Sequence, residues 1–318
     1  MLLPALARLK PYLRWAILGA TLIFMAQSFW RHWDEVLSLP IDGVGWSCLV
    51  IALGVTLLAH LWSGWVWSWV LQAFNQPVRG SWSTVVYLQT NLAKYLPGNV
   101  WHFYRRVRSL QQIDTPLVPA IFGVLLEPLL MAAAALMLAL LAADRVWPWQ
   151  GLLLGAGLLA IHPRCLNPLL LRLGQSRLAA MPQDYSESTV ALKSKDLEMH
   201  RYRLRCYPLK PLLGELGFVL LRGVGFGLVL QALVPLRVFQ LPSLLGGFSV
   251  AWLLGLLVPG APGGLGVFEA TAVALLQGEF SPAVVLSGVA LYRLISILAE
   301  AIGAGLATLE NPSRESLQ

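Results

Sequence analysis

Charged residues are scarce in this sequence, and their scarcity excludes an ordinary soluble protein. Only 12% of the 318 residues are Asp, Glu, Lys or Arg, whereas soluble globular chains carry about 25%. Hydrophobic residues make up 57% of the chain, and its mean hydropathy is +0.66. These values predict an integral membrane protein. The net charge of +7 does not require a nucleic-acid partner, because membrane proteins gather Lys and Arg in cytoplasmic loops.

The residue patterns of catalytic and metal sites are also lacking. The three cysteines are scattered, and the five histidines fall on different segments without the spacing of metal ligands. The glycine-rich run at residues 263–266 resembles part of a phosphate-binding loop but follows no soluble strand. We therefore expect no enzymatic activity, no cofactor and no metal. An intramembrane transferase that uses Tyr95 and His102 is the alternative.

Long apolar runs are abundant instead, and they predict an all-α polytopic membrane protein. A helix needs about 20 residues to cross a bilayer. Six stretches reach or approach this length: 15–30, 44–74, 117–143, 149–171, 212–236 and 282–309. Most basic residues then fall in loops on the same side, so the positive-inside rule predicts cytoplasmic N- and C-termini. We expect a multi-pass protein of the inner or plasma membrane.

Two further apolar stretches contain Pro-Gly and cannot cross as unbroken helices. The residues predicted to break them are Pro97 and Gly98 in the first stretch, and Pro259, Gly260, Gly263, Gly264 and Gly266 in the second. Proline removes a backbone donor, and glycine admits left-handed geometry. Backbone groups freed at membrane depth must be buried in protein or line a wet cavity. We therefore predict two re-entrant helical hairpins that shape a functional cavity.

The two breaks are related by an offset of 162 residues, which separates Pro97 from Pro259. The same offset moves 44–74 onto 206–236 and 117–143 onto 279–305. The order of span, broken hairpin and span therefore occurs twice, and the two copies begin on opposite sides of the membrane. Transporters built from inverted repeats bind their substrate near the midplane, where the broken segments meet.

This repeat predicts the organisation of a single membrane domain, residues 1–318. Its parts are a first helix and outer loop (1–43), repeat A (44–143), a linking helix with a basic cytoplasmic loop (144–205) and repeat B (206–310).

Three charged residues, Glu127, Arg222 and Arg293, lie near the centres of predicted spans. A charge at that depth costs at least about 2.5 kcal/mol, so it normally faces a partner or a wet cavity. Glu300 is two helical turns from Arg293, about 10.5 Å away, which is too far for pairing within one helix. Two interpretations stay open. The guanidinium groups hold an anionic lipid headgroup, or Glu127 forms an interhelical salt bridge with Arg222 or Arg293.

The residues next to the breaks complete the candidate site. Glu269 is expected to cap the short helix after the second break or to pair with one of the arginines. The predicted substrate-binding residues are Arg222, Arg293, Glu127, Glu300, Glu269, Lys94, Tyr95 and His102.

Residues 94–102 and 259–269, together with Tyr292-Arg293-Leu294-Ile295, resemble the lysylphosphatidylglycerol synthase transmembrane family, also called the flippase-like family. The resemblance extends over about residues 10–310. It implies a polytopic protein that moves or binds lipids, with relatives that act on aminoacylated phosphatidylglycerol, glycolipids, polyprenyl-linked sugars or hopanoids.

The sequence departs from that family in two respects. Long family members carry a soluble aminoacyl-transferase domain after the membrane part, and none follows here, so we do not expect lysylphosphatidylglycerol synthesis. The family often has Glu-Arg where this sequence has Glu127-Pro128.

The sequence thus favours a lipid transporter or flippase for an anionic phospholipid or a polyprenyl-linked glycolipid. The alternative is a non-catalytic accessory subunit that presents lipid to a glycosyltransferase or another lipid-modifying enzyme. Its partner would dock on the basic segment 172–210, which holds eight basic residues against four acidic ones.

Overall fold

The computed structural model describes residues 41–95, 101–142, 148–179, 202–258, 264 and 266–310. The predicted span at 15–30 and the break residues Pro97, Gly98, Pro259, Gly260 and Gly263 lie outside these ranges. The long helices are α3 (Gly43–Gln72), α6 (Leu117–Leu141), α10 (Leu209–Leu233), α11 (Leu241–Leu257) and α13 (Pro282–Leu309). The shorter elements are α4 (Gly80–Asn91), η1 (Leu92–Tyr95), α5 (Trp101–Gln111), α7 (Pro148–Ala160), α8 (Pro163–Ala179), η3 (Val238–Gln240) and α12 (Val267–Leu276).

Four of the predicted spans are confirmed as long apolar helices: α3, α6, α10 and α13. Side-chain caps fix the start of two of them. Asp42 Oδ1 accepts a hydrogen bond from Gly45 N at 2.7 Å before α3, and Ser281 Oγ accepts one from Val284 N before α13. Such caps satisfy backbone donors that the first turn leaves free.

The predicted span at 149–171 is bent. Residues Gln150–Ala160 and Pro163–Leu173 form two helical pieces with an angle of 62° between them. Pro163 begins the second piece, in agreement with the irregularity that the His162-Pro163 sequence predicts. The described residues therefore contain five helices that could cross a membrane, or six if this bent pair counts as one span.

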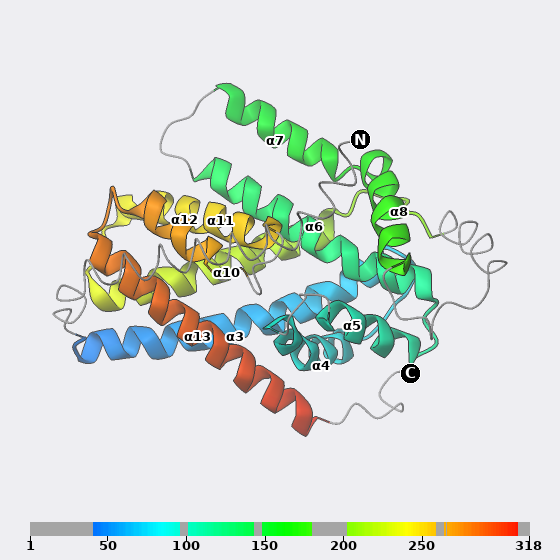
Figure 1. Ribbon diagram of the computed structural model, residues 1–318, viewed down its shortest axis with the longest axis horizontal. Helices are drawn as coiled ribbons and strands as arrows, with labels where there is room; N and C mark the ends of the chain where they lie inside the picture. Colours follow the sequence, from blue (N-terminus) through cyan, green and yellow to red (C-terminus); the bar gives the residue numbers. More distant parts are fainter. Residues whose placement is uncertain are drawn as a thin grey trace, which may run out of the picture.

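Helices α3 and α10 form the centre of the molecule and pack antiparallel (Figure 1). A Cβ atom on Gly45 would lie 2.7 Å from the Ala232 carbonyl oxygen, and one on Gly214 would lie 2.6 Å from a Val66 methyl. The absence of side chains at these two glycines lets the helices approach at both ends. Helices α6 and α13 each contact both α3 and α10, and α7 and α8 pack on the side of α6.

The helices stop on either side of both predicted breaks. At the first break, η1 ends at Tyr95 and α5 begins at Trp101. At the second break, α11 ends at Leu257 and α12 begins at Val267. Gly264 and Gly266 have φ values of +73° and +85°, the left-handed conformation that favours glycine. The segment Val238–Leu257 is long and apolar enough to cross alone, so the re-entrant geometry stays a prediction.

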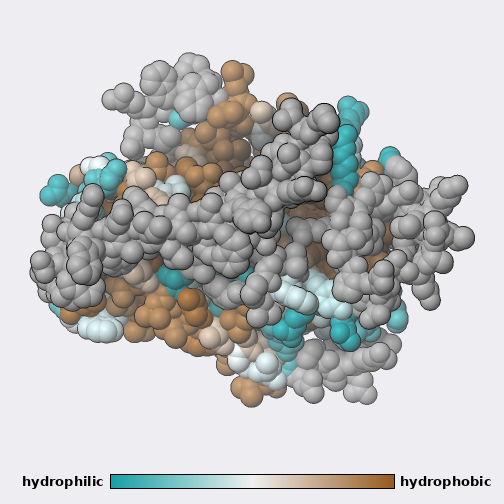
Figure 2. Space-filling view, viewed as in Figure 1, coloured by the Kyte–Doolittle hydropathy of each residue, from teal (hydrophilic) through white to brown (hydrophobic). Residues whose placement is uncertain are grey.

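The surface is that of a protein surrounded by apolar solvent. Hydrophobic residues cover much of the described surface in Figure 2. On α13, exposed apolar residues recur every three or four positions: Leu294, Ile297, Leu298, Ile302 and Leu306. A continuous exposed apolar stripe of this length fits lipid contact.

Candidate functional site

Arg222 lies in the middle of α10 and is 5% exposed. Its Nη2 donates a hydrogen bond to Ser296 Oγ on α13 at 3.2 Å, and its Nη1 lies 3.3 Å from His60 Nε2 on α3. The rings of Tyr292 and Trp252 lie 5.0 and 5.4 Å from the guanidinium carbon. The Tyr292 hydroxyl also donates to the Arg222 backbone carbonyl at 3.1 Å. Two hydrogen-bonding side chains and two aromatic rings thus hold the guanidinium, but no carboxylate of the described residues contacts it directly.

Glu300 on α13 contacts His60, which itself contacts Arg222, and it also contacts a residue next to the first break. Glu300 Oε1 lies 2.6 Å from Lys94 Nζ on η1 and 3.3 Å from His60 Nε2. The side chains of His60 and Glu300 are 3% and 1% exposed, and that of Lys94 is 19% exposed. We call Arg222, His60, Ser296, Glu300 and Lys94 the Arg222 cluster. It connects α3, η1, α10 and α13, so residues from both predicted repeats build it.

Several polar atoms of this region are buried and form no hydrogen bond within the described structure. They are Arg222 Nε, His60 Nδ1, Glu300 Oε2, Thr56 Oγ1 and Trp252 Nε1. A buried polar atom without a partner costs about 1–3 kcal/mol. Such atoms are rare in native structures and commonly mark a site that binds water or a polar ligand.

Arg293 and Glu269 form an ion pair beside the second break. Arg293 Nε donates to Glu269 Oε1 at 2.8 Å, and Nη2 bonds the same oxygen. Glu269 Oε2 accepts a hydrogen bond from Gly266 N at 2.6 Å, at the start of α12. Both roles proposed for Glu269 from the sequence are therefore confirmed, because one carboxylate caps the helix and pairs with an arginine.

The two groups of charges interact and leave a positive excess. Lys94 interacts electrostatically with Glu300, Arg222 and Arg293. Among the described residues of this region, three cations therefore face two carboxylates, Glu300 and Glu269. The undescribed residues of both breaks, 96–100, 259–263 and 265, contain no charged side chain. The region is suited to an anion.

Glu127 lies elsewhere, and both salt bridges considered for it are wrong. Its Oε2 lies 2.6 Å from Arg106 Nη1 on α5, and both side chains are 3% exposed. Arg106 Nε also donates to Thr90 Oγ1 at 3.2 Å, and the guanidinium carbon lies 3.8 Å from the centre of the Tyr87 ring. Arg106 belongs to the basic run at 105–108, yet its side chain is buried. This pair ties α5 to α6 away from the Arg222 cluster.

Glu215 on α10 is a further buried carboxyl group near this pair. It is 0% exposed, and neither carboxyl oxygen has a hydrogen-bond partner in the described residues. It interacts electrostatically with Glu127 and Arg106. The structure gives no direct bond that explains its burial.

The structure thus brings together Arg222, Glu300 and Lys94, with Arg293 and Glu269 nearby. His102 is 9% exposed in the first turn of α5, and its ring centre lies 3.9 Å from that of Phe103. The Tyr95 side chain lies outside the described structure. His60 and Ser296 were not predicted. Ser296 could have been found, because it lies four residues before Glu300 and therefore on the same face of α13.

In the described part of the chain, no three His, Cys, Asp or Glu side chains gather as metal ligands would. No family model matches the sequence, and no curated protein matches it. The family resemblance therefore stays a prediction, and the function is argued from the site.

Proposed function

We propose that this protein is a membrane lipid transporter whose Arg222 cluster binds the anionic headgroup of its substrate. The observation that carries the proposal is the positive excess among the described charges in the middle of the helices, beside buried polar atoms that have no hydrogen-bond partner in the described residues. Uncompensated charge in a low-dielectric interior is costly. An anion that enters the site removes the excess and supplies acceptors to the unsatisfied donors.

The chemistry of Arg222 favours phosphate. Its Nε has no hydrogen-bond partner among the described residues, and its other nitrogens contact a hydroxyl and an imidazole. A guanidinium group binds phosphate oxygens with two parallel hydrogen bonds that are stronger than bonds to neutral groups. Phosphate is common to anionic phospholipids and polyprenyl-linked glycolipids, so the same cluster serves either class.

Lys94 and Arg293 are the access points of this site. Their side chains are 19% and 20% exposed, whereas Arg222 is nearly buried. Each is paired with a carboxylate, Glu300 or Glu269. In the proposed cycle, the headgroup phosphate competes with these carboxylates and then reaches Arg222. When the lipid leaves, the two carboxylates pair with Lys94 and Arg293 again. This competition weakens headgroup binding enough for the lipid to be released.

An inverted repeat would give this site access from both sides of the membrane. Three observations support the repeat. The corresponding helices α3 and α10 pack antiparallel, and α6 and α13 each contact both of them. His60 and Arg222, which are in contact, are separated by the repeat offset of 162 residues. In each copy an Arg–Glu pair also joins the helix after the break to the next long helix. The arginine lies on the helix after the break in the first copy and on the next long helix in the second. Rocking of one repeat against the other would expose the cluster alternately.

The test is headgroup translocation in proteoliposomes that contain the full chain. A fluorescent anionic phospholipid in the inner leaflet should become accessible to an external quencher faster than in protein-free vesicles. A phosphatidylcholine analogue, whose headgroup is zwitterionic, should move more slowly. If the anionic lipid moves no faster than in protein-free vesicles, the protein is not a transporter of that class.

An accessory role is the second candidate, and the exposed Arg203 and Arg205 before α10 favour it. They belong to the basic segment 172–210, which would dock a glycosyltransferase or another lipid-modifying enzyme. The double substitution Arg203→Gln and Arg205→Gln distinguishes the two roles. An accessory subunit should lose its partner in co-purification, whereas a transporter should still move lipid in vesicles that contain no other protein.

A further inference from the structure

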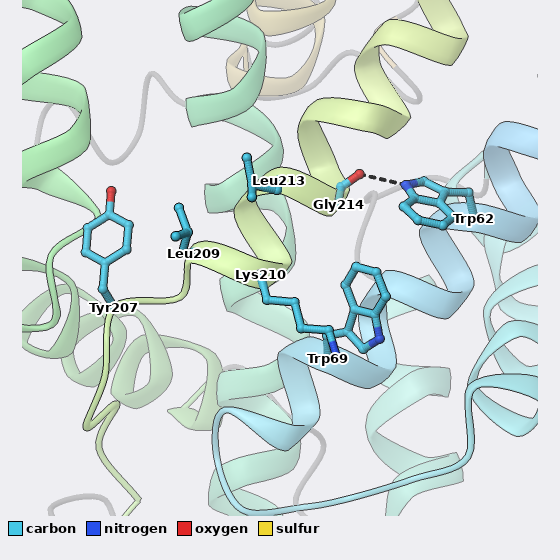
Figure 3. A pocket seen from close by; sticks show the side chains of 7 residues that line it. All are labelled: Trp62, Trp69, Tyr207, Leu209, Lys210, Leu213 and Gly214. Carbon is cyan, nitrogen blue, oxygen red and sulfur yellow. Dashed lines mark hydrogen bonds between the residues drawn. The ribbon is translucent and has the colours of Figure 1, made fainter.

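A second feature with the chemistry of a lipid site lies at one end of the central helix pair. A cavity of about 620 Å³ opens between α3, the start of α10 and the segment before it. Its lining residues are Trp62, Trp69, Tyr207, Leu209, Lys210, Leu213 and Gly214 (Figure 3). This volume lies within the range of about 300–1,000 Å³ that is typical of small-molecule sites.

The cavity lies on the opposite side of both helices from the Arg222 cluster. Trp62 is two residues after His60 on α3, and successive residues turn by about 100°, so the two side chains point about 200° apart. Leu213 is nine residues before Arg222 on α10, which places them about 180° apart. The cavity is therefore a separate site, and its occupancy does not rest on the proposed transport.

The position of the cavity matches the headgroup level of a bilayer. Trp69 lies in the last turn of α3, and Lys210 lies in the first turn of α10. Both residues are therefore at an end of a candidate span, where Trp and Lys side chains anchor helices at the membrane surface. Trp62 lies two turns deeper than Trp69, about 10.5 Å along the helix. The lining thus runs from the level of the headgroups toward that of the acyl chains.

The lining is apolar with one cationic end. Leu209 and Leu213 are 54% and 55% exposed. The Trp62 indole is held in place, because its Nε1 donates to the Gly214 carbonyl at 2.8 Å. Lys210 Nζ lies 4.6 Å from the centre of the Trp69 ring, so a cation–π contact positions its ammonium group beside the apolar wall.

The surroundings of Lys210 add positive charge. Arg203 and Arg205 are exposed in the segment that leads into α10. Tyr207, which lines the cavity, follows them in the sequence, and burial raises the pKa of its phenol, so it stays neutral and does not repel an anion. The Tyr207 hydroxyl donates to the Leu158 carbonyl at 3.1 Å and joins the segment to α7. Basic residues next to a span attract anionic lipid by about 1 kcal/mol each.

We propose that this cavity is a docking site for an anionic phospholipid of the surrounding bilayer, whose phosphate binds Lys210 while an acyl chain lies against Trp62, Trp69 and Leu213. The lining runs from the Trp62 indole at the deep end to Lys210 at the headgroup end, which is the order in which a phospholipid presents its acyl chain and its phosphate. A zwitterionic lipid fits the apolar wall equally well but gains less from the basic end. The site should therefore select by headgroup charge.

The test uses the full chain in lipid nanodiscs and a phosphatidylglycerol with a photoreactive group on one acyl chain. After illumination, mass spectrometry should find the label on the peptides that contain Trp62–Trp69 and Leu209–Gly214. Unlabelled phosphatidylglycerol should compete with this labelling, and unlabelled phosphatidylcholine should compete less. Lys210→Gln should lower the labelling about fivefold, the equivalent of about 1 kcal/mol, and Lys210→Arg should preserve it.

Arg237→Gln is the matched control. Arg237 is an exposed cation beside an aromatic ring, Phe239, at the opposite end of α10. Its replacement should leave labelling of the cavity unchanged. Equal labelling of Lys210→Gln and wild type, or equal competition by the two lipids, would overturn the proposal. Labelling measures only the occupancy of the cavity. Its result is therefore independent of whether the protein transports lipid in the proteoliposome assay.

Discussion

His60 Nε2 lies 3.3 Å from Arg222 Nη1 and the same distance from Glu300 Oε1. Arginine is a donor, and an ionised carboxylate is an acceptor. One ring nitrogen carries either a hydrogen or a lone pair, so it can hydrogen-bond to Arg222 or to Glu300 but not to both. His60 therefore connects the two charged residues without satisfying both, and a ligand that binds Arg222 would release His60 to Glu300.

This geometry predicts different effects for two substitutions of His60. His60→Leu should lower the free energy of unfolding by about 1–3 kcal/mol, because it removes a partner from a buried group. His60→Gln should recover part of this loss, since an amide carries a separate acceptor for Arg222 and donor for Glu300. Thermal unfolding of the purified variants in detergent is the measurement. Equal stabilities for Leu and Gln at this position would show that His60 only fills space.

The buried carboxyl groups of Glu127 and Glu215 should differ in how much their amide substitution changes the stability of the protein. Glu127→Gln removes the charge that balances buried Arg106, and breaking such a pair costs about 3–5 kcal/mol. Glu215→Gln breaks no hydrogen bond among the described residues, so the free energy of unfolding should stay within about 1 kcal/mol of wild type or rise. The same unfolding assay compares the two variants. A larger loss for Glu215→Gln than for Glu127→Gln would contradict this assignment of partners.

The second break should be sensitive to a single methyl group at Gly264. Gly264 has a φ of +73°, and a Cβ atom there would lie 3.2 Å from the backbone of Gly255 on α11. Left-handed geometry costs a residue with a side chain about 1–2 kcal/mol, so Gly264→Ala should destabilise the protein by at least that amount. Gly278→Ala is the control, because a Cβ atom at Gly278 meets nothing within 4 Å. Comparable melting temperatures for the two variants would mean that the break tolerates a side chain.

The sequence predicted the long helices and the position of the breaks because both depend on local signals. Apolar length identifies α3, α6, α10 and α13, and Pro-Gly ends a helix wherever it occurs. The position of Arg222 inside a long helix was predictable for the same reason, since a single arginine inside an apolar run is visible without a structure.

The partners of these charges were less predictable because they depend on tertiary packing. Arg106 lies in a basic run that is typical of a cytoplasmic loop, yet it is 2% exposed. Its spacing from His102 and Leu110, four residues on either side, was the available signal that these residues share one buried face of α5. His60 gave no such signal, because it is one of several polar residues in α3, and only the packing of α3 on α10 brings it to Arg222.

The most direct test of the proposed function is the rate at which an Arg222→Gln variant moves a fluorescent anionic phospholipid in proteoliposomes. Arg237→Gln, which also removes one arginine from the same region of sequence, is the control at equal protein density. If Arg222 binds the headgroup, Arg222→Gln should reduce the protein-dependent rate at least about tenfold, which corresponds to the loss of about 1.4 kcal/mol of headgroup binding. Arg237→Gln should transport at the wild-type rate. A folded Arg222→Gln variant that moves the anionic lipid as fast as Arg237→Gln would contradict the account.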